Sequence, residues 1–182
     1  MALKEKAEIV DADGLRRIVT RIAHEIVERN KGVDDLVLVG IRRRGVPIGA
    51  RLAQKIKEFE GREPSQGSLD ITLYRDDLST VSHQPVVGAS EIAVDINGKI
   101  VVLVDDVLYT GRTIRAAMNG LFDLGRPRRV SLCVLIDRGH REMPIESQYT
   151  GRFVQTSDSE IIEVRLREID NEERVVLVDR VE

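Results

Sequence analysis

Two apolar runs, residues 100–104 and 130–136, lie on either side of a segment with helical periodicity, residues 113–124, in this 182-residue chain. A strand with one face in water alternates apolar and polar residues, and neither run does so. A strand that is apolar along its whole length is typical of a parallel sheet covered by helices on both faces. The pattern therefore predicts a βαβ unit within an α/β fold.

The same order occurs earlier in the chain. Residues 13–29 have apolar side chains at helical spacing, with Asp11 or Asp13 available as N-cap and Gly32 as the stop. A second apolar strand, Leu36–Ile41, precedes an arginine-rich loop and a predicted helix over residues 47–59. These units predict a central, mainly parallel sheet flanked by helices, with its binding loops at the carboxyl ends of the strands.

Two other segments are less regular. Residues 69–74 are predicted to form a strand, and residues 75–91 are polar and without periodicity, which predicts a long loop. Residues 161–169 alternate, residues 170–173 are polar and residues 174–181 are rich in apolar side chains, which predicts a C-terminal β-hairpin. Without a linker or repeat, we expect one domain over residues 1–182, with a small cap, or hood, mainly from residues 150–182.

Composition excludes several classes of protein. No apolar run approaches the roughly 20 residues that cross a bilayer, and residues 1–13 have no apolar core of a signal peptide. Cys133 is the only cysteine, so an internal disulfide and a zinc site with paired cysteines are excluded and a reducing cytoplasm is expected. His24, His83 and His140 are too dispersed to predict a metal site. An aromatic content of 3% argues against stacking on single-stranded nucleic acid as the main activity.

The most informative segment for chemistry is VVLVDDVLYTGRT, residues 101–113. Backbone N–H groups at the start of the following helix, with the hydroxyls of Thr110 and Thr113, form a cradle suited to a phosphate. Asp105 and Asp106 stand at the strand exit, where carboxylates suit a ribose diol or, through water, Mg²⁺. In a strand the two side chains point to opposite faces, so one of them faces the ligand unless the chain turns there. A phosphorylated sugar is predicted, and neither the Walker A motif nor G-x-G-x-x-G occurs.

A second loop, GIRRRG at residues 40–45, concentrates positive charge after a strand. Guanidinium groups and backbone N–H groups can together hold a diphosphate. The alternative is a patch of solvated arginines, which charge runs often are.

Residues 101–113 resemble the signature for 5-phosphoribosyl 1-diphosphate (PRPP) of the type I phosphoribosyltransferases. The resemblance implies the fold of that family, with Mg²⁺ arriving on the diphosphate of PRPP and no metal held by the protein alone. It implies catalytic roles for Asp105, Asp106 and Arg75. Nucleotide binding is implied for Ile41, Arg42, Arg43, Asp105, Asp106, Val107, Leu108, Tyr109, Thr110, Gly111, Arg112 and Thr113.

Tyr109 is a departure that bears on the substrate. Members that salvage purines usually carry an acid at this position, whereas Tyr109 is an uncharged phenol. A purine base is therefore disfavoured, although plain packing accounts for Tyr109 equally well.

Residues 20–26, 40–47, 74–78 and 137–142 look like those of the bifunctional pyrimidine-operon regulators with uracil phosphoribosyltransferase activity, the PyrR family. The likeness implies that residues 74–83 belong to a loop that closes over the active site, with Arg75 contacting diphosphate. It also implies a base pocket formed by Asp137, Arg138 and Ile162. The family pattern GKNIPT is replaced here by GRFVQT, residues 151–156, which affects the base contacts.

The first predicted helix has a basic stripe opposite its apolar face. Arg17, Arg21 and His24 share this stripe, and Thr20 is adjacent. The stripe alone is explained by an ordinary exposed face with Arg21–Glu25 and His24–Glu28 pairs. The resemblance instead implies RNA contacts, which would be made by Thr20, Arg21, His24, Arg141 and Arg152.

The resemblance thus implies a UMP- or UTP-responsive regulator that binds leader mRNA of pyrimidine genes and also makes UMP from uracil and PRPP. It implies a homodimer or a larger homo-oligomer. Two alternatives stay open: a purine phosphoribosyltransferase without RNA function, and a nucleotide-sensing RNA regulator with weak catalysis.

Overall fold

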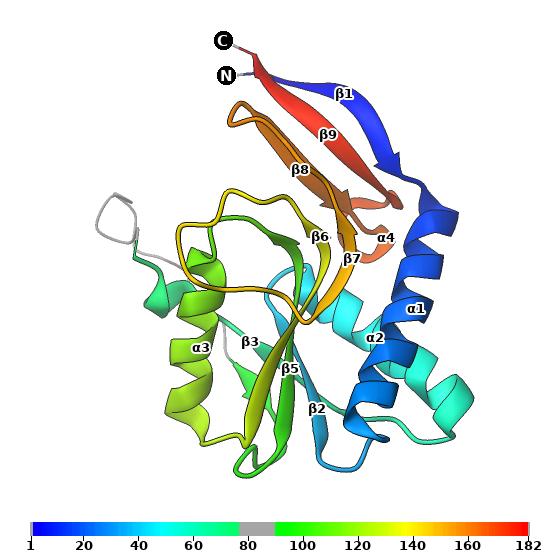
Figure 1. Cartoon of the computed structure of the whole chain (residues 1–182), viewed down its shortest axis with the longest axis vertical. Helices are drawn as coiled ribbons and strands as arrows, with labels where there is room; N and C mark the ends of the chain where they lie inside the picture. Colours follow the sequence, from blue (N-terminus) through cyan, green and yellow to red (C-terminus); the bar gives the residue numbers. More distant parts are fainter. Residues whose placement is uncertain (1, 77–89, 182) are drawn as a thin grey trace.

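A computed structural model describes residues 2–76 and 90–181, and these form two sheets (Figure 1). Within the described residues the core sheet has the strand order β4-β3-β2-β5-β6-β7, and every pairing is parallel except that of β3 with β4. Its strands are β2 (Leu36–Ile41), β3 (Ser65–Leu69), β4 (Glu91–Ile92), β5 (Ile100–Leu108), β6 (Arg129–Asp137) and β7 (Tyr149–Phe153). The predicted mainly parallel sheet is confirmed.

Helices cover both faces of the core sheet. They are α1 (Ala12–Asn30) and α2 (Gly45–Glu60) on one face and α3 (Arg112–Leu124) on the other. Alternate residues of β2 serve the two faces: Leu36 and Leu38 pack with α1 and α2, while Val37 and Val39 pack with α3. The continuous apolar strands are thus explained by burial on both sides. No helix in the described parts of the chain has the length and apolar character needed to cross a membrane.

The hood is the second sheet together with the connection between its last two strands. Its strands are β1 (Ala2–Val10), β9 (Arg174–Val181) and β8 (Glu160–Arg165), paired antiparallel in that order. The predicted C-terminal hairpin is confirmed as β8 and β9, with the single turn of α4 (Arg167–Asp170) in its connection. The sequence did not predict β1, in which Glu5 and Lys6 pair with residues of β8 and β9. The hood therefore draws on both ends of the chain, whereas β7 belongs to the core sheet.

The predicted strand over residues 69–74 is wrong. Leu69 is the last residue of β3, where it pairs with Ile41. The Asp70 carboxylate then accepts hydrogen bonds from the backbone N–H and the hydroxyl of Thr72, at 2.8 and 2.5 Å. This local turn ends the strand and starts a short 3₁₀ helix, Thr72–Tyr74.

The predicted boundary between strand and loop at residue 105 is also wrong. Pairing with β6 extends β5 as far as Leu108, opposite Asp137, so Asp105 and Asp106 lie within the strand. The predicted long loop falls largely on residues 77–89, outside the described residues, and its end forms β4. The part of the closing loop predicted at residues 77–83 is likewise outside them.

Candidate functional site

Two loops meet at the carboxyl ends of the neighbouring strands β2 and β5. The loop after β2 lies so close to β5 that a Cβ atom on Gly45 would stand 2.1 Å from the carbonyl oxygen of Val104. A Cβ on Gly40 would stand 2.6 Å from the carbonyl oxygen of Gly45. The two glycines therefore hold the arginine loop against the strand that carries the paired aspartates. The Arg42–Arg43 peptide bond in this loop is cis.

A hollow of about 600 Å³ opens between these loops. Eight of the residues that the sequence assigned to PRPP or catalysis line it: Ile41, Arg42, Arg43, Arg75, Asp105, Asp106, Val107 and Thr113. Asp70, Ile71, Thr72 and Arg44 complete the lining. The remaining residues of the signature, Leu108, Tyr109, Thr110, Gly111 and Arg112, do not line it. The fold thus brings together residues from two loops and from the segment after β3.

The two aspartates differ in burial. Asp105 is 7% exposed, whereas Asp106 is half-buried at the hollow, as expected for successive residues of a strand. Burial, and then the charge of Asp106, raises the pKa of the Asp105 carboxyl well above its usual value. Each carboxylate accepts the backbone N–H of the next residue at 2.9 Å, and in the described parts of the chain neither pairs with a cation. Their remaining lone pairs are available to sugar hydroxyls or to a hydrated cation.

The predicted phosphate cradle falls at the start of α3. Gly111 has φ of 90°, and a Cβ there would stand 3.0 Å from the Cβ of Met143, so glycine suits this position on both grounds. Thr110 Oγ1 accepts the backbone N–H of Arg112 at 3.3 Å. The Arg112 guanidinium points to Glu142 and Asp76, at 2.6 and 2.8 Å. First-turn N–H groups of a helix lack intrahelical acceptors and favour an anion.

The three adjacent arginines have different partners. Arg42 donates to the hydroxyl of Ser68 from both Nε and Nη2, at 3.3 and 3.1 Å. Arg44 crosses to the hood and pairs with Asp170 of α4 at 2.8 Å. Arg43 is exposed, and its side chain has no partner among the described residues. The loop is therefore not a uniform charged patch, since one arginine faces solvent and one joins the loop to the hood.

A second hollow of about 350 Å³ lies between the arginine loop and β8 and shares Arg44 and Asp106 with the first. Ile162, predicted for the base pocket, lines it. Asp137 and Arg138, predicted for the same pocket, line neither hollow and are buried.

Asp137 and Arg138 are held by neighbouring segments. The Asp137 carboxylate pairs with Arg141 at 2.6 Å. Arg138 donates to Thr156 Oγ1 at 3.0 Å, and its guanidinium carbon lies 3.9 Å from the centre of the Tyr109 ring. Burial lowers the pKa of the Arg138 guanidinium. Tyr109 and Thr156 thus belong to the surroundings of this buried pair, and Thr156 is the last residue of the segment 151–156 that the sequence linked to the base contacts.

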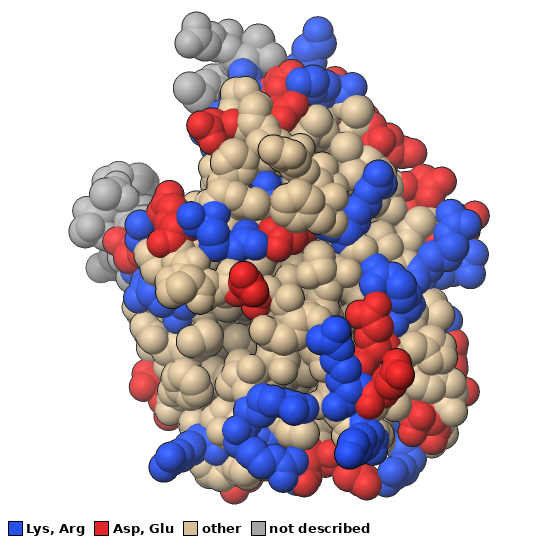
Figure 2. Space-filling model, in the orientation of Figure 1, with Lys and Arg blue, Asp and Glu red and all other residues tan. Residues whose placement is uncertain are grey.

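The residues predicted to contact RNA have different surroundings in the fold. Arg21 pairs with Glu25 at 2.6 Å, as the alternative interpretation predicted, and also donates to the carbonyls of Thr150 and Gly151 in β7, at 3.2 and 2.5 Å. Arg152, also on β7, donates to the carbonyl of Ile9 at 2.7 Å. Figure 2 shows Lys and Arg interspersed with Asp and Glu over the face that carries α1 and β7.

The other predicted RNA contacts have different surroundings. Thr20 donates its hydroxyl to the carbonyl of Arg16 at 2.9 Å. His24 stacks on Phe59 of α2 rather than pairing with Glu28, with ring centres 4.0 Å apart. Arg141 is turned inward, toward Asp137 and the carbonyl of Tyr109, so it lies with the base pocket residues.

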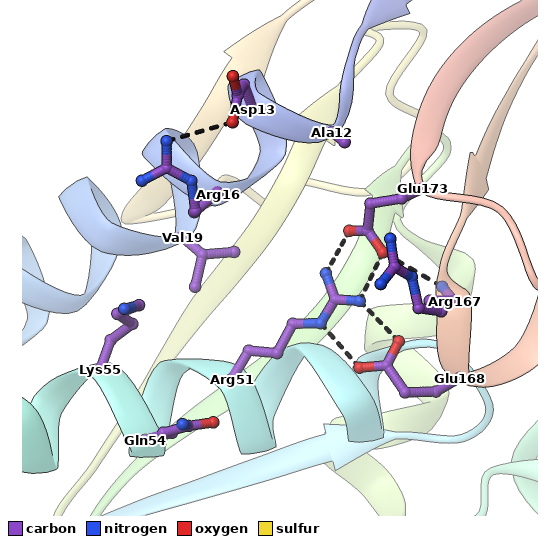
Figure 3. Close-up of a pocket in the computed structure, with 10 residues that line it drawn as sticks. All are labelled: Ala12, Asp13, Arg16, Val19, Arg51, Gln54, Lys55, Arg167, Glu168 and Glu173. Atoms are coloured by element: carbon purple, nitrogen blue, oxygen red, sulfur yellow. Dashed lines mark hydrogen bonds and ion pairs between the residues drawn. The ribbon is translucent and has the colours of Figure 1, made fainter.

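A third hollow, of about 540 Å³, lies between α1, α2 and the α4 connection, away from the paired aspartates (Figure 3). Arg51 of α2 reaches across it to both oxygens of Glu168, at 2.8 and 2.6 Å, and of Glu173, at 2.5 and 2.8 Å. These carboxylates raise the pKa of Arg51, which therefore joins α2 to the hood as a cation. None of the residues predicted from the sequence to bind a ligand lines this hollow.

Comparison with known proteins identifies close relatives. The phosphoribosyl transferase domain family matches residues 6–169. A protein called "Bifunctional protein PyrR" from Pelotomaculum thermopropionicum is 63% identical, over 98% of this chain and 99% of the relative. One of the same name from a Thermoanaerobacter species is 58% identical, over 98% of this chain and 100% of the relative.

Solved structures show the same fold at lower identity. A hypoxanthine-guanine phosphoribosyltransferase from Bacillus anthracis superposes with a TM-score of 0.71 and 18% identity, over 98% of this chain and 100% of that one. The hypoxanthine phosphoribosyltransferase of Trypanosoma cruzi gives a TM-score of 0.73 at 18% identity, over 97% and 92% of the two chains.

Proposed function

Because the chain belongs to the phosphoribosyl transferase family and, within it, to the bifunctional PyrR proteins, we propose that it combines two activities. It transfers the 5-phosphoribosyl group from PRPP to uracil, which yields UMP and diphosphate. It also binds leader mRNA of pyrimidine genes in a manner that depends on UMP or UTP. The observation that carries the enzymatic half is the hollow in which the arginine loop, the paired aspartates and the start of α3 come together.

In this proposal each part of the site has one task. The first-turn amides of α3, with Thr110 and Thr113, hold the 5-phosphate. Asp105 and Asp106 accept hydrogen bonds from the ribose hydroxyls, and Arg43 and Arg75 bind the diphosphate. The reaction breaks the bond from the anomeric carbon to diphosphate and forms a bond from that carbon to uracil N1. Positioning and charge compensation on the leaving group are the tasks for this chain, because the transition state resembles an oxocarbenium ion.

The donor set fits a magnesium ion that arrives on PRPP. Asp106 is half-buried at the hollow and has no cationic partner among the described residues, and Mg²⁺ commonly keeps several waters and takes one or two carboxylates beside substrate phosphates. When bound, the ion supplies charge neutralisation on the departing diphosphate. We assign Asp106, directly or through water, as the residue of this chain that would hold it.

The base is proposed to lie in the adjoining hollow under the hood, beside Ile162. Asp137 and Arg138, predicted for the same pocket, are held by Arg141, Thr156 and Tyr109, and none of these five residues lines that hollow. No side chain in the hollow is assigned as a general base for uracil.

An initial-rate assay tests the enzymatic half. Purified protein with Mg²⁺ and PRPP is offered uracil, orotate, hypoxanthine, guanine and adenine in parallel. We expect nucleotide from uracil only. Formation of IMP or GMP would contradict the proposal, and UMP binding without turnover of any base would favour a sensor with weak catalysis.

A gel-shift titration with leader RNA, with and without UMP, tests the regulatory half. Coupling between two binding sites is reciprocal, so UMP must change RNA affinity by the factor by which RNA changes UMP affinity. Equal RNA affinities with and without UMP would refute nucleotide sensing. Sedimentation of the same samples tests the proposed homodimer or larger homo-oligomer.

A cytoplasmic location suits the single thiol, Cys133, which is buried with its pKa raised by that burial.

A further inference from the structure

All three phenylalanines of this chain are exposed, and among the described residues only Phe59 stacks on another ring. Phe59, in the last turn of α2, is 37% exposed. Its ring is stacked on that of His24 from α1, with centres 4.0 Å apart and an angle of 16° between the planes. The two rings therefore cover one face of each other, and a further ring can extend the stack only from an outer face.

Packing of α1 against α2 does not need this pair. The two helices already bury apolar side chains against each other and the sheet, among them Ile22, Ile26, Leu52 and Ile56, each 0% exposed. Phe59 and His24 are both exposed and lie outside that buried cluster. Because an exposed ring contributes less hydrophobic free energy than a buried one, core stability alone is a weak reason for a phenylalanine here.

Polar groups suited to a nucleic acid lie one helical turn from each ring. Thr20 precedes His24 by four residues on α1, and Lys55 precedes Phe59 by four residues on α2. Thr20 uses its hydroxyl proton on the carbonyl of Arg16 but keeps an oxygen that can accept. Arg17 precedes His24 by seven residues, two turns along the same helix face, and Lys55 pairs with Glu58 at 2.7 Å.

We propose that Phe59 and His24 together form a stacking platform for an unpaired base of the RNA, an inference that rests on the RNA half of the proposed function. Proteins that recognise RNA by sequence mostly bind bases splayed out of single-stranded loops and stacked on aromatic rings. Phe59 is then an RNA-contacting residue in its own right, and it also holds the imidazole of His24 in a fixed plane. Duplex RNA, whose bases are already stacked, does not use the platform.

Phe59→Leu and Phe59→Tyr test the proposal against the unchanged protein. The probe is a labelled pool of RNA hairpins with randomised single-stranded loops, and dissociation constants are measured in the presence of UMP at several salt concentrations. We expect Phe59→Leu to weaken binding about tenfold and Phe59→Tyr less than about twofold, because stacking contributes roughly 1–3 kcal/mol per base. The slope of affinity against salt should not change, since no phosphate contact is lost.

Two controls complete the design. Phe122→Leu removes another exposed phenylalanine, 51% exposed on α3, and should bind RNA as the unchanged protein does. Uracil transfer should keep its rate in all variants, which shows that they are folded. Equal hairpin affinity of Phe59→Leu and the unchanged protein overturns the platform alone, as does an equal loss for blunt duplex RNA. Failure of the unchanged protein to bind any hairpin overturns the RNA half of the proposed function, and the platform with it.

Discussion

The core sheet and the hood are held together by different forces. Strands of the core sheet bury aliphatic side chains on both faces, with Leu103 and Val102 at 0% exposure. The hood buries apolar side chains as well, with Val175 and Val176 at 0% exposure, but it is also laced by ion pairs, such as Lys6–Glu160 and Arg174–Glu5, both at 2.6 Å. Burial of apolar surface is not screened by salt, whereas exposed ion pairs are weak and screened. The comparison indicates that exposed ion pairs contribute more to the hood than to the core sheet.

Two arginines, one in the loop after β2 and one in α2, connect the core sheet to the hood. Arg44 in the arginine loop reaches Asp170, and Arg51 on the next helix reaches Glu168 and Glu173. The position of the hood is thereby tied to the loop that we propose binds diphosphate. The following predictions test whether the core sheet and the hood are as different as this comparison implies.

The largest effect is expected from Asp106→Asn at the carboxyl edge of the core sheet. Loss of a charged acceptor for the ribose hydroxyls and the hydrated cation should lower kcat/KM for uracil by about 100-fold or more. Asp179→Asn, a carboxylate of the hood outside both hollows, is the matched control and should stay close to the unchanged rate. Steady-state kinetics together with Tm measure both, and an unchanged kcat/KM in Asp106→Asn would remove the site assignment.

Leucine truncation compares the two regions directly. Leu103→Ala in β5 should lower the free energy of unfolding by about 2–5 kcal/mol, as other buried leucines do. Leu177→Ala in β9 removes the same atoms from a half-buried position and should cost about 1 kcal/mol, because less apolar area is lost. Denaturant titrations give both values. Equal costs would show that the hood depends on burial as strongly as the core sheet does.

Arg51→Gln should loosen the hood without touching the PRPP hollow. The Arg51 side chain is 24% exposed and pairs with two carboxylates. We therefore expect the free energy of unfolding to fall by about 1–3 kcal/mol, between the ranges for exposed and buried ion pairs. KM for uracil should rise more than KM for PRPP. Lys55→Gln is the control, because Lys55 lines the third hollow with Arg51 and, among the described residues, pairs with Glu58 alone. Equal rises in both KM values would contradict a role confined to the hood.

The smallest effect is expected from acid, which should destabilise the hood before the core sheet. A hydrogen bond from Lys6 lowers the pKa of Glu160 to about 2, and Arg165 and Arg174 lower the pKa of Glu172. A lowered pKa contributes stability above the unfolded value, about 4.3, and that stability is lost as pH falls toward the folded value. The raised pKa of Asp105 makes the opposite contribution to stability. Because the folded state retains this proton more readily than the unfolded state does, acid favours folding at this residue.

Hydrogen exchange between pH 5 and 2 measures this difference. After correction for intrinsic exchange rates, protection in β1, β8 and β9 should fall before protection in β2, β5 and β6. Loss of protection at the same pH in both sheets would show that the ion pairs of the hood make no separate contribution.

Much of the core sheet could be predicted because its signals are local. Apolar runs, helical periodicity and the glycine-rich turns at residues 40–45 and 110–112 each act over a few neighbouring residues. The paired aspartates and the phosphate cradle were recognisable for the same reason. The strand at residues 69–74 was predicted wrongly because the side chain of Asp70 ends β3 with a turn that periodicity does not reveal.

Amino-acid order alone thus determined the α/β class, the two binding loops and the C-terminal hairpin, since each depends on contacts within one short segment. Tertiary structure decided which distant side chains meet. It placed β1 beside β9, turned Arg141 inward, stacked His24 on Phe59 and paired Arg44 with Asp170, 126 residues away. Such pairings depend on how whole elements pack, because a charged or aromatic side chain finds its partner only after the buried apolar surfaces have set the distance between helices and sheets.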